Sequence, residues 1–200
     1  MENKKNYQLE LDRIIKDITD SHRVPTLLLH SCCGPCSSYV VTYLMKYFDV
    51  TVLYYNPSIY PEEEYIHRYE EQKRLLHELG IPLKEIGYDH ESYLKCVKGL
   101  ESETEGGGRC RVCFEQRIRK TAELAEEGGF DYFCTTLTVS PHKNARIINE
   151  VGMMAEAFCS KTRWLPSDFK KREGYKKSVE LSAEYGLYRQ DYCGCEYSKR

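Results

Sequence analysis

The stretch of residues 25–48, "PTLLLHSCCGPCSSYVVTYLMKYF", contains the strongest indication of the fold. Its short apolar run ends in a cluster of cysteines, and a segment with the length and apolar spacing of a helix follows. The next stretch, "DVTVLYYNPSIYP" (residues 49–61), is rich in β-branched and aromatic residues and contains an Asn-Pro pair, which predicts a second strand. Strand, helix and strand in this order indicate a βαβ unit.

The same alternation continues along the chain. Residues 62–80 predict a helix, because three glutamates follow Pro61 and the pattern stops at Gly80. Further strands are expected at residues 81–89 and 131–139, with helices at 110–129 and 140–158, and "ESETEGGG" (residues 101–108) reads as a flexible acidic loop. Strands that alternate with helices predict an α/β fold with a doubly wound, mostly parallel sheet.

Bulk features narrow the class of protein. A chain of 200 residues suits a single domain, 1–200, and the weak helical pattern within residues 1–23 predicts an N-terminal helical extension. Basic and acidic residues nearly cancel, 29 against 31, so an anionic partner must be met by a local patch. We expect a cytoplasmic protein without a membrane association, since we find no secretory signal and no apolar run near about 18 residues.

Cysteine usage is the most unusual feature of the composition. There are ten cysteines, and in a reducing compartment clustered cysteines more often bind metal or perform redox work than form static disulfides. The clustered ones form three groups: Cys32, Cys33 and Cys36; Cys110 and Cys113; Cys193 and Cys195. Ligands of open parallel sheets bind outside the carboxyl ends of the strands. The first group follows the first strand and is therefore expected at that edge.

Several kinds of site are compatible with these groups. Four thiolates from two separated pairs can hold a structural zinc ion, and four can also hold an iron-sulfur cluster. The surplus of thiols beyond four favours redox chemistry. A disulfide between Cys193 and Cys195 would close a very small, strained ring, which is typical of a labile dithiol; two further metal ligands are the alternative interpretation. Cys134, in a predicted strand, is expected to be a core residue.

Five segments carry a resemblance to a known family: "LLLHSCCGPCSSYVV", "YYNPSIYPEEEYIHRYEEQKR", "RCRVCFEQRIRKTAELA", "FCTTLTVSPHKNARIINEVG" and "DFKKREGYKKSVELSAEYGLYRQDYCGCEYS". In order and spacing they resemble the QueH type of epoxyqueuosine reductase over residues 24–198. The resemblance implies a fold like that of PP-loop (HUP-like) nucleotide-binding enzymes, with a helical, cysteine-containing C-terminal segment. It also implies reduction of epoxyqueuosine to queuosine at the wobble position of tRNA, the last step of queuosine biosynthesis.

The resemblance further implies the cofactors and their ligands. A 4Fe-4S cluster is expected on Cys32, Cys33, Cys110 and Cys113, a redox-active disulfide at Cys193 and Cys195, and a second, mononuclear iron beside the cluster. Cys36 is not needed by a four-thiolate cluster and is our candidate ligand for the extra iron, with a free thiol as the alternative. We expect no use of ATP, because the glycine- and serine-containing phosphate loop is missing from the sequence.

The implied reaction also requires groups that store electrons and groups that donate protons. Removal of an epoxide oxygen to leave an alkene consumes two electrons and two protons and releases water, whereas an iron-sulfur cluster passes one electron at a time. Cys193 and Cys195 are candidates for a two-electron store, refilled by an unidentified electron donor. Asp191, Asp168 and His142 are candidate proton donors because of their places in the sequence.

A local basic surface is required for an interaction with the anticodon loop of tRNA. Residues 161–177, "KTRWLPSDFKKREGYKK", interleave cations with Trp164, Phe169 and Tyr175, which suits phosphate contacts and base stacking. A solvated helix face is the alternative interpretation. The residues that we expect to bind tRNA are Lys170, Lys171, Arg172, Lys176 and Lys177.

Two other classes of function compete with the reductase. A zinc-stabilised RNA-binding protein would use the basic segment alone, and a thiol-based sulfur carrier or disulfide reductase would use only Cys193 and Cys195.

Overall fold

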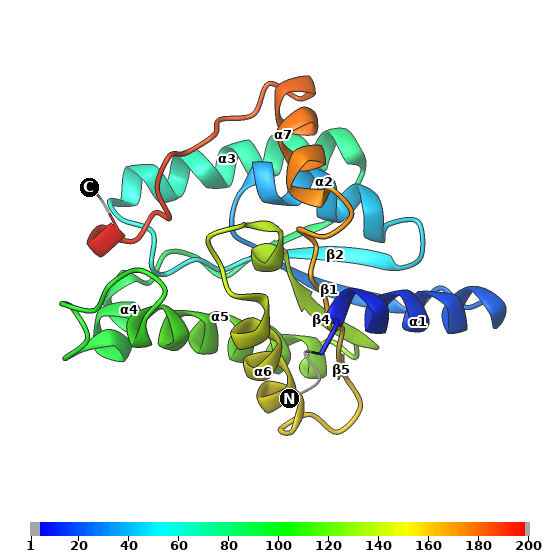
Figure 1. Ribbon diagram of the computed structural model, residues 1–200. Coiled ribbons are helices and arrows are strands. Elements are labelled where there is room, and N and C mark those ends of the chain that lie inside the picture. The colour runs from blue at the N-terminus through cyan, green and yellow to red at the C-terminus, as the bar shows by residue number, and fades with distance from the viewer. Residues whose placement is uncertain (1–4, 199–200) are drawn as a thin grey trace.

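A computed structural model describes residues 5–198 and consists of a five-stranded sheet with helices on both faces (Figure 1). The strands lie in the order β3-β2-β1-β4-β5, and every neighbouring pair is parallel. Their bounds are β1 Thr26–Ser31, β2 Asp49–Tyr54, β3 Leu83–Glu85, β4 Tyr132–Thr135 and β5 Arg163–Trp164. The predicted doubly wound, parallel α/β fold is confirmed.

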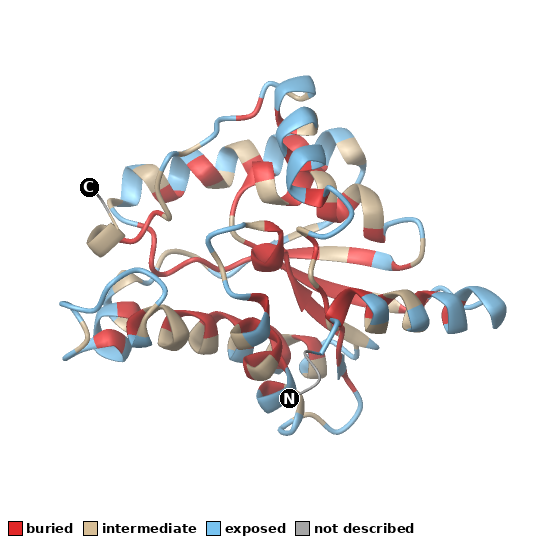
Figure 2. Ribbon diagram, in the orientation of Figure 1, coloured by how far each residue is buried: buried red, intermediate tan, exposed pale blue. Residues whose placement is uncertain are grey.

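Helices cover both faces of the sheet because three consecutive residues of the central strand, Leu27, Leu28 and Leu29, are apolar and buried. Leu27 and Leu29 of β1 pack in one cluster with α1 (Tyr7–Asp20), α2 (Gly34–Leu44) and α3 (Glu62–Leu79). Leu28 packs on the other face with α5 (Gly108–Glu127) and α6 (Ala145–Glu156). Successive residues of a strand point to opposite faces, so a strand that is buried on both faces has a continuous apolar run, as β1 has at Leu27, Leu28 and Leu29. Figure 2 shows the buried residues concentrated along the sheet and on the inward helix faces.

The N-terminal helix α1 packs on this core. Leu11, Ile15 and Ile18 follow helical spacing, are buried, and belong to the same apolar cluster as Leu27 and Leu29. The side chain of Asn6 caps the helix by accepting a hydrogen bond from the backbone N–H of Leu9. The helix predicted in this region is therefore present, and it contributes to the central hydrophobic core.

Two short elements have no counterpart in the sequence-based expectation: α4 (His90–Val97), which packs on α5, and the edge strand β5. The helix expected in the C-terminal segment is present as α7 (Gly174–Glu184), which packs on α2. The predicted fourth strand ends at Thr135, and a 3-10 turn, η1 (Thr136–Val139), completes it. In residues 5–198, we find no helix that combines the length and the apolar character needed to span a membrane.

The segment 101–108, expected to be a flexible loop, is held by side chains of its own neighbourhood. Arg109 is 2% exposed and donates hydrogen bonds to the carbonyl oxygens of Leu100, Glu101 and Glu103. The carboxylate of Glu103 accepts a hydrogen bond from the N–H of Gly108, at the start of α5. Because the loop supplies acceptors for a buried cation and for a helix start, it positions the first turn of α5, which carries Cys110.

Candidate metal and redox site

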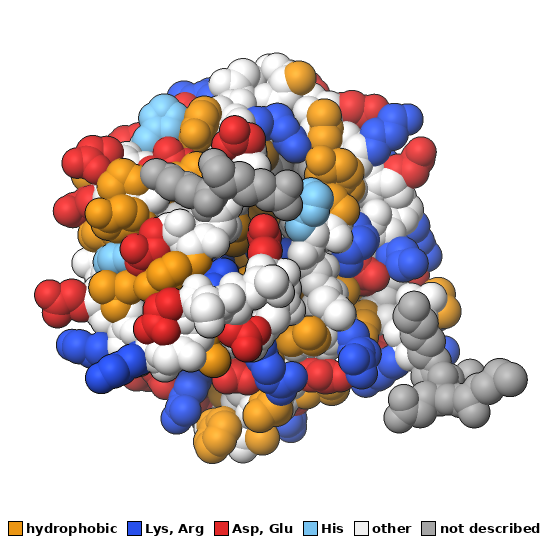
Figure 3. Space-filling model, turned by 60° about the vertical axis from the view of Figure 1, so that its left-hand side comes forward, with side chains coloured by type: hydrophobic (Ala, Val, Ile, Leu, Met, Phe, Trp, Pro, Cys, Tyr) orange, Lys and Arg blue, Asp and Glu red, His pale blue; other side chains and the backbone are white. Residues whose placement is uncertain are grey.

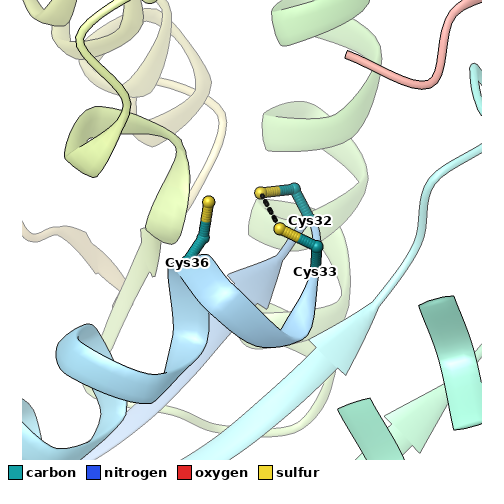
Figure 4. A group of neighbouring side chains, drawn as sticks. All are labelled: Cys32, Cys33 and Cys36. Atoms are coloured by element: carbon teal, nitrogen blue, oxygen red, sulfur yellow. Dashed lines mark hydrogen bonds between the residues drawn. The ribbon is translucent and has the colours of Figure 1, made fainter. Parts of the chain in front are cut away.

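Three thiols lie together where β1 ends. The sulfur atoms of Cys32, Cys33 and Cys36 all lie within 4.8 Å of one another, and those of Cys32 and Cys33 are 3.7 Å apart. Figure 4 shows the three sulfurs facing a common space between the loop and the first turn of α2. Within residues 5–198, this is the one group of three or more metal-ligating side chains with such close spacing.

Local structure explains how adjacent cysteines can face the same space. Neighbouring residues in a strand point to opposite faces, but Cys33 is the N-cap of α2 and Pro35 occupies the first turn, so the chain changes from strand to helix at this point. Beneath the loop, the buried hydroxyl of Ser31 hydrogen-bonds to Ser37 and Gln72. The thiols therefore stand at a helix N-terminus, where the helix dipole favours negative charge.

The thiols perturb one another's protonation. Hydrogen bonds from Cys33 and Cys36 hold the pKa of Cys32 well below its usual range. The hydrogen bond to Cys32 raises the pKa of Cys33 to about 12, and hydrogen bonds to Cys32 and Cys33 raise that of Cys36. The thiol of Cys32 therefore loses its proton readily, whereas the thiols of Cys33 and Cys36 do not. Binding of a metal ion by all three sulfurs would have to release those remaining protons.

Two cations balance the negative charge of the thiols. Arg117 of α5 is 3% exposed, and its guanidinium donates to the sulfur of Cys113 over 3.2 Å. Burial lowers the pKa of Arg117, but the charge of Cys113 and other thiolates outweighs this, so that the pKa is raised. The pKa of Lys143 is raised likewise, against burial, by the thiolates of Cys193 and Cys32. We find no carboxylate ion pair of Arg117 or Lys143 among the residues that the structure describes.

These observations test whether the residues fit a metal centre. Arg117 is buried and Lys143 is half-buried, and neither forms a carboxylate ion pair among the described residues. Both therefore need another anionic neighbour, since burial of an unpaired charge is costly. Clustered thiolates at a helix N-terminus are such neighbours, and sulfur is the preferred ligand of zinc and iron-sulfur centres. The donor set and its surroundings therefore fit a thiolate-bound metal centre.

Two members of the three-thiol group, Cys32 and Cys36, line a cavity of about 590 Å³. Its walls come from the loop after β2, with Asn56 and Ser58, from residues 139–143 after β4, and from residues 189–193. A smaller cavity of about 70 Å³ is lined by Cys110, Cys113, Cys193 and Cys195. Both cavities share Arg117, His142, Lys143 and Cys193, so all three predicted cysteine groups lie around adjoining spaces. Cys110 and Cys113 are not members of the close three-thiol group.

The C-terminal cysteines are carried by a segment that runs back from α7 along α3 (Figure 1). Arg68 of α3, 2% exposed, donates to the carbonyl oxygen of Cys193 over 3.2 Å, and the N–H of Tyr60 donates to the carbonyl oxygen of Gly194 over 2.9 Å. Gly194 has φ +98°, a conformation that favours glycine, and a Cβ there would lie 2.8 Å from the Arg68 guanidinium. The turn between the two thiols is thus fixed by its backbone.

The two C-terminal thiols differ in environment. Both are free in this structure. Cys195 is 7% exposed, and its sulfur lies 2.9 Å from the hydroxyl of Tyr93 on α4. Burial raises the pKa of the Cys195 thiol, and the hydrogen bond with Tyr93 acts in the opposite direction. Cys193 is half-buried and faces both cavities.

The structure separates the three candidate proton donors. Asp191 and His142 are exposed and line the larger cavity. Asp168 does not line it, and its carboxylate is paired with Lys170 over 2.6 Å. Asp168 is therefore better explained as an ion-pair partner than as an acid of this site.

The basic segment is only partly the surface that its sequence suggested. Trp164 and Phe169 are 4% and 1% exposed, so the expectation that they stack on bases is wrong; Trp164 packs on Phe133 in the core. Tyr175 is 41% exposed and lines the larger cavity. Both rings belong to the core: Trp164 lies in β5 beneath α6, and Phe169 packs in the cluster that contains Leu27 and Leu29.

The predicted tRNA-binding cations are partly neutralised. Lys170 pairs with Asp168, Arg172 with Asp12 of α1, and Lys176 with Glu173 and Glu180. Lys171 and Lys177 are exposed. On the face shown in Figure 3, basic and acidic side chains alternate without a continuous region of one sign.

Sequence reasoning missed Arg68, Tyr93 and Lys143. Arg68 and Lys143 fall inside the segments that carry the family resemblance, and Lys143 follows the fourth strand, where ligands of parallel sheets bind. Nothing in the sequence signalled Tyr93, because α4 was not predicted. Arg117 lies four residues after Cys113, a spacing that places both on one face of α5.

A parallel sheet of this order, with clustered thiols and two cations at the carboxyl ends of its strands, defines an α/β protein with a metal or redox centre. Solved structures share the fold. The U34-tRNA thiolase NcsA from Methanococcus maripaludis with its 4Fe-4S cluster superposes with a TM-score of 0.57 at 13% identity, over 96% of this chain and 68% of that one. A predicted subunit of tRNA methyltransferase from Methanocaldococcus jannaschii gives a TM-score of 0.51 at 16% identity, over 79% of this chain and 75% of that one.

Sequence comparison gives the family. Residues 27–200 match the family Epoxyqueuosine reductase QueH. The relative of that name from Streptococcus pyogenes is 43% identical over 98% of this chain and 80% of its own length, and the one from Staphylococcus epidermidis is 41% identical over 99% and 87%. The chain belongs to the epoxyqueuosine reductase QueH family, and hence to the oxidoreductases.

Proposed function

We propose that this chain reduces epoxyqueuosine to queuosine at the wobble position of tRNA, the last step of queuosine biosynthesis. The observation that carries the proposal, beside family membership, is the group of three thiols at the end of β1, two of which line a cavity that Cys193 also lines. Reduction of an epoxide to an alkene needs a source of two electrons, two protons and an enclosed place for the reacting ring. The cavity and its side chains can supply all three.

The ligands that we assign to a 4Fe-4S cluster are Cys32, Cys33, Cys110 and Cys113. When bound, such a cluster supplies electrons one at a time and carries net negative charge with its four thiolates. Arg117 and Lys143 border both cavities and would offset that charge. Cys36 is not among these four ligands, and we assign it to a second, mononuclear iron.

The chain's own groups then have distinct roles. Asp191 and His142 line the larger cavity and are exposed, so either can pass a proton from solvent to the departing oxygen. Cys193 and Cys195 hold two electrons as a dithiol, which matches the electron count of the reaction. Asn56 and Ser58, both buried in the wall, restrict the space in which the ring can lie.

Two measurements test the proposal: the metal content of the purified protein and its activity on epoxyqueuosine in tRNA. Protein purified without oxygen should contain iron with matching acid-labile sulfide, and it should convert epoxyqueuosine to queuosine in tRNA when a reductant is added. Mass spectrometry of the digested tRNA measures the conversion. Stoichiometric zinc without sulfide, together with no conversion, would contradict the reductase and favour a zinc-stabilised RNA-binding protein.

We also propose that tRNA contacts the surface formed by Lys170, Lys171, Arg172, Lys176 and Lys177, which adjoins Tyr175 at the larger cavity. The double charge reversal Lys171→Glu and Lys177→Glu removes two exposed cations of this surface that form no carboxylate ion pair among the described residues. We expect the Kd for tRNA to rise by about tenfold or more and the slope of log Kd against log salt concentration to fall by about 1.5.

A matched control for this measurement is Lys46→Glu. Lys46 is exposed but precedes β2, so it lies at the opposite end of the sheet from the thiols. Its reversal should leave the salt slope nearly unchanged. Equal losses in the two proteins would mean a general charge effect, and unchanged binding of the double variant would remove this segment from the interface.

A further inference from the structure

The two thiols of the C-terminal pair face different surroundings although one residue separates them. Cys193 is half-buried and lines both the larger and the smaller cavity. Cys195 is 7% exposed, lines only the smaller one, and packs in a buried cluster with Tyr93, Val97 and Cys113. A reagent that arrives through the larger cavity therefore meets Cys193 first.

Tyr93 holds the buried thiol. Its ring is 1% exposed, and its hydroxyl lies 2.9 Å from the sulfur of Cys195. A buried hydroxyl is costly to leave without a partner, so this contact fixes the position of the sulfur as well as that of the ring. No comparable contact is formed by the sulfur of Cys193 among the side chains that the structure describes.

The backbone between the thiols keeps this difference in place. Arg68 binds the carbonyl oxygen of Cys193, the N–H of Tyr60 binds that of Gly194, and Cys195 forms an antiparallel bridge with Ile59. Three anchors within three residues prevent the turn from rotating so as to exchange the two thiols. The order of access is therefore a property of the fold.

We propose that Cys193 is the exchanging thiol of the pair, which an incoming reductant attacks, and that Cys195 is the buried leaving thiol, positioned by Tyr93. The inference rests on the redox role of the pair in the proposed function. It assigns a different task to each cysteine, which the redox role by itself does not do.

The exchange that this order describes is balanced with a dithiol as reductant. A thiolate of the dithiol attacks the sulfur of Cys193, the Cys193–Cys195 bond breaks, and Cys195 departs with the bonding electron pair and takes up a proton. The second thiol of the reductant then attacks its own sulfur on Cys193, which releases Cys193 as a thiol. Two electrons and two protons have moved to the pair, and the reductant leaves as a disulfide.

Single-cysteine variants of the anaerobic holoprotein test the order of access. Glutathione disulfide is the probe, and the tryptic peptide of residues 190–199 reports the mixed disulfide by mass, apart from the other cysteines. We expect Cys195→Ser to form a mixed disulfide at Cys193 at least about ten times faster than Cys193→Ser forms one at Cys195. Equal rates, or faster reaction at Cys195, would overturn the assignment.

The variant Tyr93→Phe tests the positioning role, with Tyr65→Phe as a matched control. Tyr65 is also buried, but its hydroxyl binds Glu85, away from the pair. Reduction of the oxidised pair by dithiothreitol should slow roughly threefold to tenfold in Tyr93→Phe and stay unchanged in Tyr65→Phe, because one hydrogen bond to the leaving sulfur is lost. An unchanged rate in Tyr93→Phe would refute the role.

Failure of this inference differs from failure of the proposed function. If the serine variants keep full epoxyqueuosine reduction, the pair has no redox role in the reaction. If the serine variants lose epoxyqueuosine reduction but Cys195 reacts with glutathione disulfide faster than Cys193, the proposed reductase function stands. The tasks assigned to Cys193 and Cys195 are then wrong.

Discussion

The variants Cys32→Ser and Cys110→Ser are each expected to lose most bound iron and acid-labile sulfide and to reduce epoxyqueuosine at least about 100-fold more slowly than the unaltered protein. The two cysteines come from different elements, the end of β1 and the first turn of α5, and line adjoining cavities. A cluster that needs four thiolates should not survive the loss of either, since a serine hydroxyl is a poor ligand for iron in such clusters.

The matched control is Cys96→Ser. Cys96 is exposed on α4 and belongs to none of the cysteine groups, so its variant should keep the iron, sulfide and activity of the unaltered protein. Iron and sulfide analysis and tRNA digestion measure the two readouts separately. Full iron in Cys110→Ser would show that the cluster ligands lie elsewhere, and Cys36 would then be the first replacement to examine.

The double variant Cys193→Ser and Cys195→Ser is expected to lose multiple turnover by about 100-fold or more when a dithiol is the reductant, and to retain its iron and sulfide. The pair lines the cavities but is not among the ligands that we assign, so its removal should spare the metal centre. With dithionite, a one-electron donor, conversion should be largely retained because the two-electron store is bypassed.

Iron analysis distinguishes this result from simple damage to the site. Loss of iron in the double variant would mean that Cys193 or Cys195 is a metal ligand, which is the alternative that the short spacing left open. Full multiple turnover with the dithiol would eliminate the electron store.

Much of the fold follows from local pattern. The apolar run of β1, the aromatic and β-branched run of β2 and the acidic start of α3 each predict their element, and the succession of strands and helices predicts a parallel sheet. The short elements α4 and β5 escaped prediction because they are formed by packing. β5 contains only Arg163 and Trp164 and is recognisable only by its pairing with β4.

The site was predictable to the level of its cysteines. The position of Cys32, Cys33 and Cys36 directly after the first strand predicts that they lie at the carboxyl edge of the sheet, because the loop that follows a parallel strand must lie there. The same reasoning misjudged Trp164 and Phe169, since an aromatic ring among lysines has the same sequence pattern whether it stacks on a base or closes a core.

Local sequence pattern is sufficient to predict the order of the longer strands and helices, the edge at which the first thiols lie, and the family. The folded structure is needed to know what surrounds the thiols. Within residues 5–198, Arg117 and Lys143 lie beside them without a carboxylate ion pair, Arg68 fixes the C-terminal turn, and Tyr93 gives Cys195 an environment different from that of Cys193. The physical reason is distance along the chain. Tyr93 and Cys195 are 102 residues apart, and Arg68 and Cys193 are 125 apart, so their contacts arise from the packing of α3, α4 and the C-terminal segment rather than from any local pattern.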